Sequence, residues 1–381
     1  MMKSKKSLGI YLHIPFCIQK CAYCDFCSFP NTSAELREKY VDALCRDIED
    51  RAKLCRDHIS DTVYFGGGTP TLLTVLQFER IFSALRENFD ISPDAEITVE
   101  CNPKTADLGY FCDLRRLGVN RLSIGMQSAH DRELEALGRV HRSEDFFRAF
   151  ADARRAGFDN ISVDLMFGIP YQTEKSFKKT LEIVTELEPE HISAYGLIIE
   201  EGTPFFANRE KLVLPGEDRE YTMYTEAVGF LAHRGYKRYE ISNFSKPERE
   251  SRHNLKYWQR DEYVGLGVSA HSFLCEKRSF APADINAYLR GQYEKGCEEI
   301  SENDAMSEYV MLAMRTVRGV DLNVFYDRFG KDFDEMFADK LKPYRYGGFV
   351  VRKDGNCAFT DSGFYVSNEI LSEILDFDQT Y

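Results

Sequence analysis

Four cysteines stand close together near the start of the chain, at Cys17, Cys21, Cys24 and Cys27. Three residues separate the first two, and two residues separate each later pair. A loop with three thiolates can bind three irons of a [4Fe-4S] cluster and leave the fourth iron free for another ligand, whereas a cluster that only carries electrons is normally held by four cysteines. The first three cysteines therefore predict an iron-sulfur centre with an open iron.

Other sites compete with this interpretation. A ferredoxin cluster on the last three cysteines would need a cysteine followed by a proline, where the chain has Asn31 and Thr32, so that site is excluded. A structural zinc site needs a fourth ligand, and Cys27 is available for this role, so zinc stays an alternative. A cluster of buried thiols without metal is a further, less favoured one.

The elements that must position these thiols alternate between strand and helix. A strand at Leu8–Ile14, ended by Pro15, leads into the cysteine loop. Five more strands are predicted at Asp61–Phe65, Glu96–Glu100, Arg121–Met126, Ile161–Met166 and His191–Leu197. The helices between them are predicted at residues 32–58, 72–89, 105–117, 143–156 and 174–187. This alternation predicts an α/β fold with a parallel sheet, and periodicity leaves open whether the sheet is flat or a partial barrel.

Polar residues and glycines stand at or near the end of each of the first five strands. They are Cys17, Gly66, Glu100, Gln127 and Asp164. The C-terminal ends of parallel strands meet on one face, where loops and helix N-termini converge. The sequence therefore predicts that these residues share one site.

The pattern changes after Glu200. A helix is predicted at residues 217–234, a short strand at 239–244, and close backbone packing in the Gly/Ser-rich segment 264–273. Later come helices near 308–315 and 322–329, a hairpin that turns at 353–355, and a last helix. This mix predicts a smaller, mostly helical, winged-helix-like C-terminal domain. The expected domains are residues 1–215, 216–290 and 291–381.

Size and charge restrict the function. The chain has 381 residues, 43% of them hydrophobic, and a net charge of -13, which disfavours a nucleic-acid partner. No stretch reaches the roughly 18 apolar residues of a membrane span. The basic start, residues 1–6, lacks the apolar core of a signal peptide. Eleven cysteines in a chain of this size fit a reducing compartment, so we expect a cytoplasmic protein without a transmembrane segment.

The segment around the cysteines is similar to the radical S-adenosylmethionine (SAM) signature. Its words resemble the oxygen-independent coproporphyrinogen oxidase family, and its HemW-type heme-chaperone branch in particular. The resemblance implies a partial (β/α)6 barrel in which Cys17, Cys21 and Cys24 hold a [4Fe-4S] cluster that chelates SAM. The oxidase branch carries a fourth cysteine where this chain has Phe26, and the chaperone branch carries an aromatic residue there. Cys27 comes one residue too late to restore the oxidase pattern.

The word Gly66–Pro70 (Gly-Gly-Gly-Thr-Pro) lacks the ending of a phosphate-binding loop. Triple glycine after a strand lets bare backbone approach a ligand, although an isolated word of this kind is more often a tight turn. Beside the cysteine loop it resembles the family's contact to the methionyl amine of SAM. The resemblance therefore implies that Gly67, Gly68 and Thr69 bind SAM.

Five further side chains match words of the family. By this resemblance, Gln127 and Asp164 would bind the ribose of SAM, and Arg139 would bind its carboxylate. Glu100 would bind the polar end of SAM, and Tyr11 would pack near the cluster or the adenine. A carboxylate suits ribose hydroxyls, and an arginine fork suits a carboxylate. The alternative for each is a residue that ties a strand end to its loop by hydrogen bonds.

The segment Ser251–Trp258 holds His253 and the single tryptophan of the chain. Histidine can ligate heme iron axially, and nearby aromatic side chains can cover the macrocycle. The word His-Asn-x-x-Tyr-Trp is similar to the motif associated with heme in HemW-type proteins, which makes His253 the candidate axial ligand. Composition alone favours a hydrogen-bonded packing residue. His271 is a second candidate, and His13 is expected to be structural.

The expected function is that of a radical SAM protein that binds heme and hands it to acceptor proteins, with a low-potential electron donor as a further partner. Coproporphyrinogen decarboxylation is the main alternative. The resemblance implies an N-terminal extension in the oxidases, and we expect no counterpart before Leu8, which disfavours this alternative. The acidic balance disfavours a radical SAM enzyme that modifies RNA. An iron-sulfur protein without turnover is the last alternative.

Overall fold

A curved sheet of parallel strands forms the centre of the computed structural model, which describes residues 5–375. Residues 1–4, in the basic start of the chain, and 376–381, at the end of the expected C-terminal domain, lie outside the described residues. Six strands follow one another in space as in sequence, each parallel to the next. They are β1 (Lys6–Ile14), β4 (His58–Gly67), β5 (Ile91–Cys101), β6 (Arg121–Gln127), β7 (Ile161–Phe167) and β8 (His191–Gly196). The predicted α/β partial barrel is confirmed.

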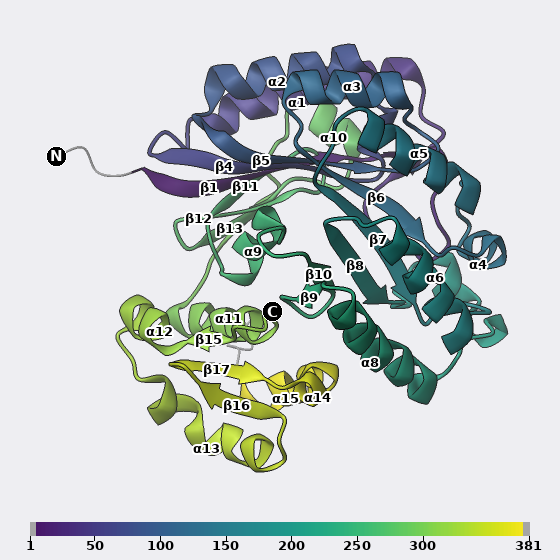
Figure 1. Ribbon diagram of the computed structural model, residues 1–381. Helices are drawn as coiled ribbons and strands as arrows, with labels where there is room; N and C mark the ends of the chain where they lie inside the picture. The colour runs from purple at the N-terminus through teal and green to yellow at the C-terminus, as the bar shows by residue number, and fades with distance from the viewer. Residues whose placement is uncertain (1–4, 376–381) are drawn as a thin grey trace.

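Helices between these strands cover the convex outer face of the sheet (Figure 1). They are α1 (Ala34–Ala52), α2 (Val75–Asn88), α3 (Leu108–Leu117), α4 (Asp131–Ala136), α5 (Ser143–Arg155) and α6 (Glu174–Glu186). Side-chain caps explain where several of them begin, because Ser33, Thr74, Asp107 and Thr173 each accept a hydrogen bond from an amide of the first turn. Each helix therefore begins just after a loop that lies at the strand ends.

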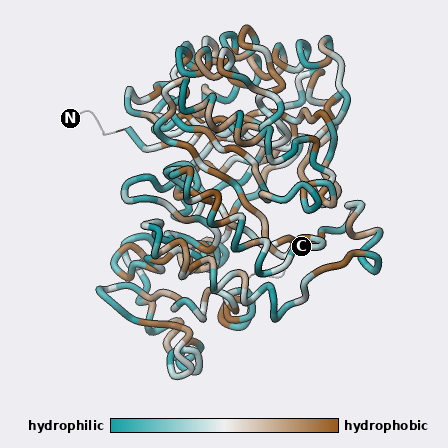
Figure 2. Tube along the Cα trace, turned by 45° about the vertical axis from the view of Figure 1, so that its right-hand side comes forward, coloured by the Kyte–Doolittle hydropathy of each residue, from teal (hydrophilic) through white to brown (hydrophobic). Residues whose placement is uncertain are grey.

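The two faces of β1 differ, as strand periodicity requires. Leu8, Ile10 and Leu12 are fully buried under the outer helices. Tyr11 and His13 point to the concave side, where the ring of Tyr11 lies against neighbours on the sheet. In Figure 2 the central strands contain brown, hydrophobic stretches, while many outer turns are teal. The concave face is thus the more polar face.

The sheet continues beyond the six strands at both edges, to twelve strands in all. Beside β1 lie β11 (Tyr263–Leu266), which is parallel to it, and then β12 (His271–Leu274), β13 (Lys277–Phe280) and β14 (Gly296–Glu299), which are antiparallel. Beside β8 lie the antiparallel β10 (Asn243–Ser245) and β9 (Lys237–Arg238). A Cβ atom at Gly265 would fall 2.0 Å from the carbonyl oxygen of His271, so the close backbone packing predicted for this segment is confirmed.

One predicted strand was wrong. Residues 239–244 form no single strand, because residues 239–242 lie between β9 and β10 as a turn. The carboxylate of Glu240 accepts hydrogen bonds from the Ser242 amide and from the Asn243 side chain, and these bonds close the turn. A local side-chain bond of this kind competes with strand pairing.

The helix predicted at residues 217–234 is α8 (Glu217–His233), which packs beside α6. A short helix, α9 (Arg252–Trp258), lies on the concave side of the sheet (Figure 1). Its first amides, at Arg252 and His253, donate to the carboxylate of Glu96 on β5. The remaining short elements are β2 (Phe16–Cys17), β3 (Phe29–Pro30), α7 (Pro204–Ala207), α10 (Ile285–Leu289) and the 3-10 turns η1 (Pro70–Leu72) and η2 (Arg209–Lys211).

The C-terminal part forms a separate lobe of helices and a small sheet (Figure 1). Its elements are α11 (Glu302–Met314), β15 (Val320–Asp321), α12 (Leu322–Phe329), α13 (Phe333–Tyr346), β16 (Val350–Lys353), β17 (Asn356–Phe359), α14 (Asp361–Tyr365) and α15 (Ser367–Ile374). The predicted hairpin is present, with positive φ angles of 52° at Asp354 and 79° at Gly355, as a mirror-image turn requires. The helix α13 was not predicted. The domain boundaries at residues 215 and 290 stay predictions.

None of the helices within residues 5–375 combines the length and the apolar character that a bilayer requires.

Candidate functional site

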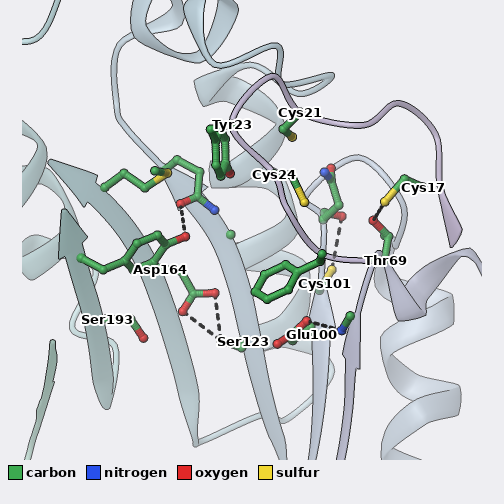
Figure 3. Close-up of a pocket in the computed structure, with 18 of the residues that line it drawn as sticks. Cys17, Cys21, Tyr23, Cys24, Thr69, Glu100, Cys101, Ser123, Asp164 and Ser193 are labelled. Carbon is green, nitrogen blue, oxygen red and sulfur yellow. Dashed lines mark hydrogen bonds between the residues drawn. The ribbon is translucent and has the colours of Figure 1, made fainter. Parts of the chain in front are cut away.

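A cavity of about 590 Å³ opens at the C-terminal ends of the parallel strands (Figure 3). Its lining includes ten of the residues expected from the sequence, which come from the cysteine loop and from the strand ends. They are Cys17, Cys21, Cys24, Gly67, Gly68, Thr69, Glu100, Gln127, Arg139 and Asp164. Tyr11 and His253 are not among the lining residues. The structure therefore brings together the predicted cluster and SAM residues, and it leaves these two outside.

The cysteine loop forms one lip of the cavity (Figure 3). The hydroxyl of Thr69 lies 3.9 Å from Cys17 Sγ, and the guanidinium of Arg139 lies 3.7 Å from Cys21 Sγ, both as donors. Burial raises the pKa of the Cys17 and Cys24 thiols, and it is the largest influence on both. Donors that point at sulfur favour thiolates. Within residues 5–375, no three cysteine, histidine, aspartate or glutamate side chains are grouped so that they could hold a single metal ion.

The fourth cysteine of the run lies apart from the cavity. The Cys27 thiol donates to the carbonyl oxygen of Ala283 at 3.7 Å, and Cys27 is not one of the lining residues. The preceding residue, Phe26, is 69% exposed and does line the cavity. Three thiols beside an open cavity fit a [4Fe-4S] cluster whose fourth iron is left free for a ligand.

The glycine word brings bare backbone next to the loop. Gly67 has a φ angle of 112°, which favours glycine. A Cβ atom at Gly68 would lie 2.6 Å from the carbonyl oxygen of Phe16, so no larger residue fits there without a shift of the backbone. These two positions explain why the chain uses glycine where β4 meets the cysteine loop.

Two carboxyl groups face the cavity from neighbouring strands. Glu100 accepts hydrogen bonds from the Tyr64 hydroxyl at 2.9 Å and from the Gly67 amide at 3.1 Å. Burial, and then the charge of Asp164, raise the pKa of Glu100 to about 7. Both carboxyl oxygens of Asp164 accept from Ser123 Oγ, at 2.9 and 3.0 Å (Figure 3). The pair can accept hydrogen bonds from ammonium and hydroxyl groups of a ligand.

The end of β6 is irregular. Gln127 has a φ angle of 64°, and the register between β6 and β7 shifts at this point. The Gln127 side chain accepts a hydrogen bond from the Tyr195 hydroxyl at 2.9 Å, and Arg139 donates to the carbonyl oxygen of Gly125 at 3.0 Å. Residues held in such conformations cluster at functional sites.

Tyr11 lies outside the cavity, next to the residues that support the end of the cysteine loop. Its hydroxyl is 3.0 Å from His13 Nδ1, and His13 Nε2 is 2.8 Å from the carbonyl oxygen of Cys27. Burial lowers the pKa of His13, so the ring stays neutral near neutral pH. Tyr11 and His13 thus connect β1 to the end of the cysteine loop, which is the structural role expected for His13.

His253 is 1% exposed and does not line the cavity. Its Nδ1 is 2.8 Å from Thr62 Oγ1, and its Nε2 is 2.8 Å from the Tyr257 hydroxyl, so both ring nitrogens have partners. Burial lowers its pKa to about 3. This placement favours the packing residue over the axial ligand, because ligation would need one of these bonds to open. His271, on β12, does not line the cavity either.

Several residues that line the cavity were not expected. Tyr23, Arg121, Ser123, Tyr195 and Asn254 are among them. The signal for Arg121 was present in the sequence, because a charged residue begins an otherwise apolar strand. Tyr23 and Tyr195 carried no such signal, since aromatic residues are common in buried segments.

Two parts of the chain match known families. Residues 11–184, which include the cysteine loop and Asp164, match the radical SAM superfamily. Residues 300–366 match the HemN C-terminal domain. The radical SAM superfamily implies a [4Fe-4S] cluster and SAM, and the three thiols at the lip fit this cluster.

Relatives match over nearly the whole chain. The heme chaperone HemW of Bacillus subtilis is 34% identical over 373 residues, which cover 96% of this chain and 98% of the relative. The chain belongs to the HemW family. HemW of Synechocystis sp. is 36% identical and covers 96% of this chain and 95% of the relative, and HemW of Escherichia coli is 34% identical and covers 81% and 82%.

The HemW fold also matches a solved structure. Coproporphyrinogen III oxidase (HemN) from Escherichia coli, a radical SAM enzyme, superposes with a TM-score of 0.84. It is 26% identical, and the match covers 98% of this chain and 91% of the HemN chain. Because a HemW-family chain and HemN share one fold, the fold does not separate a chaperone from an oxidase. Individual residues at the lip of the cavity must do so.

Proposed function

We propose that this chain is a heme chaperone, which binds a [4Fe-4S] cluster and SAM in the cavity and carries heme as cargo for acceptor proteins. The observation that carries the proposal is the lip of the cavity. Three thiols line it, and the exposed Phe26 stands where the oxidase branch has a further cysteine. The names of the relatives support the same function.

The lip would hold the cluster and the charged end of SAM. The cluster, when bound, would supply the electron for reductive cleavage of SAM. Cys17, Cys21 and Cys24 are the proposed ligands. Arg139, which already points at Cys21 Sγ, would pair with the methionyl carboxylate.

The strand ends would hold the rest of SAM. Asp164 and Gln127 are proposed for the ribose. Glu100, held by Tyr64, would accept from the methionyl amine, beside the bare backbone of Gly67–Thr69. Tyr11 would act as a positioning residue.

The mouth of the cavity offers apolar surface for a macrocycle. Phe26 is 69% exposed and Ile198 is 70% exposed, and both line the cavity. Apolar side chains that line a cavity suit contact with a largely apolar ligand. We propose that they pack against heme. His253 would become an axial ligand only if its bond to Thr62 or Tyr257 opened.

Acceptor proteins and a low-potential electron donor are the proposed partners. We place the function in the cytoplasm, because all eleven cysteines are free thiols, which suits a reducing compartment.

A heme titration tests the proposal. The anaerobically reconstituted chain is expected to retain heme through gel filtration and to transfer it to an apo-heme protein, with absorption spectra as the readout. A Phe26→Ser variant is expected to bind heme more weakly and to keep its iron. A reconstituted chain that retains no heme would rule the chaperone out.

The likeness to HemN keeps coproporphyrinogen oxidation as a second candidate. In this reaction two propionates would become vinyl groups. Reconstituted protein, SAM, reductant and coproporphyrinogen under anaerobic conditions are expected to yield no such product. Product formation at the rate of an authentic oxidase would reverse the ranking.

A further inference from the structure

Arg121 is a buried cation in the cavity without a partner. It begins β6 and is 2% exposed, yet it is one of the lining residues. Its Nε atom is buried and has no hydrogen-bond partner. Within residues 5–375, no hydrogen bond or ion pair of the Arg121 guanidinium is found.

Other buried arginines in the described chain are paired. Arg260, also in the concave half of the molecule, forms ion pairs of 2.7 Å with Glu276 and 2.9 Å with Glu308. A buried charge without a partner is costly, because it loses its hydration and gains no ion pair in return. The cost is removed if an anion occupies the cavity beside Arg121.

No carboxylate within residues 5–375 forms an ion pair with Arg121. Arg121 influences the pKa of Glu100 through space, but no ion pair within 4.0 Å forms between them. The carboxylate of Glu100 is bound by Tyr64 and Gly67, and that of Asp164 by Ser123. The guanidinium is therefore available to a ligand.

An amide side chain lines the same cavity as Arg121. Asn254, from the His-Asn-x-x-Tyr-Trp word, lines the cavity, and its side chain makes no hydrogen bond to the part of the chain that the structure describes. The neighbouring His253 connects α9 to β4 through Thr62, while its other ring nitrogen contacts Tyr257 within α9 itself. A guanidinium and a free amide donor together suit a carboxylate.

We propose that Arg121 and Asn254 form a carboxylate subsite that binds a propionate of the porphyrin cargo. The inference rests on the proposed function in so far as the cargo is a porphyrin. It assigns the two cavity arginines to different anions. Arg139, next to the cysteine loop, would bind the carboxylate of SAM, and Arg121 would bind a propionate of the porphyrin. The His-Asn-x-x-Tyr-Trp word then contributes through Asn254, while His253 positions the helix.

The test compares heme with heme dimethyl ester, in which both propionates are esterified. The reconstituted full chain is titrated with each, and absorption gives both dissociation constants. The wild type is expected to prefer heme by about ten- to a hundredfold, as for a charge-assisted hydrogen bond. Arg121→Gln is expected to bind both ligands equally. Arg121→Lys should keep part of the preference, because it keeps the charge without the fork.

Arg260→Gln is the matched control, since it removes a buried arginine outside the cavity. It is expected to lower stability and to leave the preference for heme unchanged. A wild type without preference, or an Arg121→Gln variant that keeps it, would overturn the subsite. In both cases heme still binds, so the proposed chaperone function would stand.

Two further measurements cover the other outcomes. If circular dichroism shows that Arg121→Gln does not fold, Arg121→Lys and Asn254→Ala are titrated instead. An unchanged preference for heme over its dimethyl ester in both variants would refute the subsite. If the wild type binds no heme, metal-free coproporphyrin, a tetracarboxylate, is titrated by fluorescence. Binding that Arg121→Gln abolishes would keep the subsite and remove heme as the cargo, and no binding at all would remove both.

Discussion

The cysteine loop and α9 both contain residue types that can ligate a metal, but they use them in opposite ways. On the loop, Cys17, Cys21 and Cys24 line the cavity, and donors point at two of their sulfurs. On α9, both nitrogens of His253 are bound by neighbouring side chains outside the cavity.

The difference lies in how the polar atoms are used. A polar residue that lines the cavity can serve a ligand, whereas a buried one that does not line it, with all its polar atoms paired, contributes to the fold. Residue type and spacing do not distinguish these cases.

The largest expected effect concerns the loop. Cys21→Ser should lower the iron bound after anaerobic reconstitution by about tenfold or more, since even changes outside the ligand shell cost about that much. Cys27→Ser is the matched control and should keep wild-type iron, because its thiol contacts Ala283 rather than the cavity. Equal loss of iron in both variants would instead indicate a four-cysteine site. Iron is measured by a colorimetric assay.

The next effect concerns α9. His253→Ala should lower the free energy of unfolding by about 2–4 kcal/mol, because it leaves a cavity and two unpaired polar groups. Heme affinity should fall by at most a fewfold, since His253 would act on the porphyrin only through the position of Asn254 on α9. Urea unfolding and heme titration measure the two quantities. A large loss of heme affinity in a variant of wild-type stability would place His253 at the heme.

The pH dependence of stability tests whether His253 is held neutral in the folded chain. His253 has a pKa of about 3 in the folded chain, below its value in the unfolded chain, so the unfolded state binds more protons in mild acid. Its contribution to stability is therefore present at neutral pH and falls by about 2 kcal/mol between about pH 6.5 and 5. The difference in stability between wild type and His253→Gln should shrink over this range. A constant difference would mean that His253 is not held neutral.

The smallest effect concerns Glu100, whose pKa is about 7. Only its ionised form pairs with an ammonium group, so SAM affinity should rise by about tenfold between about pH 6 and 8, in proportion to the ionised fraction. Glu100→Gln should bind SAM more weakly and without this rise. Calorimetry at several pH values measures both, and a parallel rise in the variant would assign the dependence to another group.

The local sequence pattern was sufficient to predict the barrel and most of the residues that line its cavity. The alternation of strand and helix predicted the six consecutive strands of the barrel, and their ends indicated where Glu100 and Asp164 would meet. This succeeded because the C-terminal strand ends of a parallel sheet share one face by construction.

Contacts between segments that are distant in the sequence could not be predicted from the local sequence pattern. The pairing of β11 with β1 joins Gly9 to Tyr263, and no periodicity encodes it. The hydrogen bond between His253 and Thr62 likewise joins residues that are far apart in the sequence, so local periodicity does not encode it. The helix α13 was missed because Pro343 lies inside it, and proline normally ends a helix.

The pairing of β1 with β11 also bears on how the chain is made. During synthesis the cysteine loop leaves the ribosome long before Tyr263, so one edge of β1 stays without a partner until the later segment arrives. A fragment that ended at residue 215 would keep this edge exposed beside the cysteine loop, and exposed edges promote aggregation. The strand that leads into the cysteine loop is therefore expected to gain its second neighbour only after most of the chain has been translated.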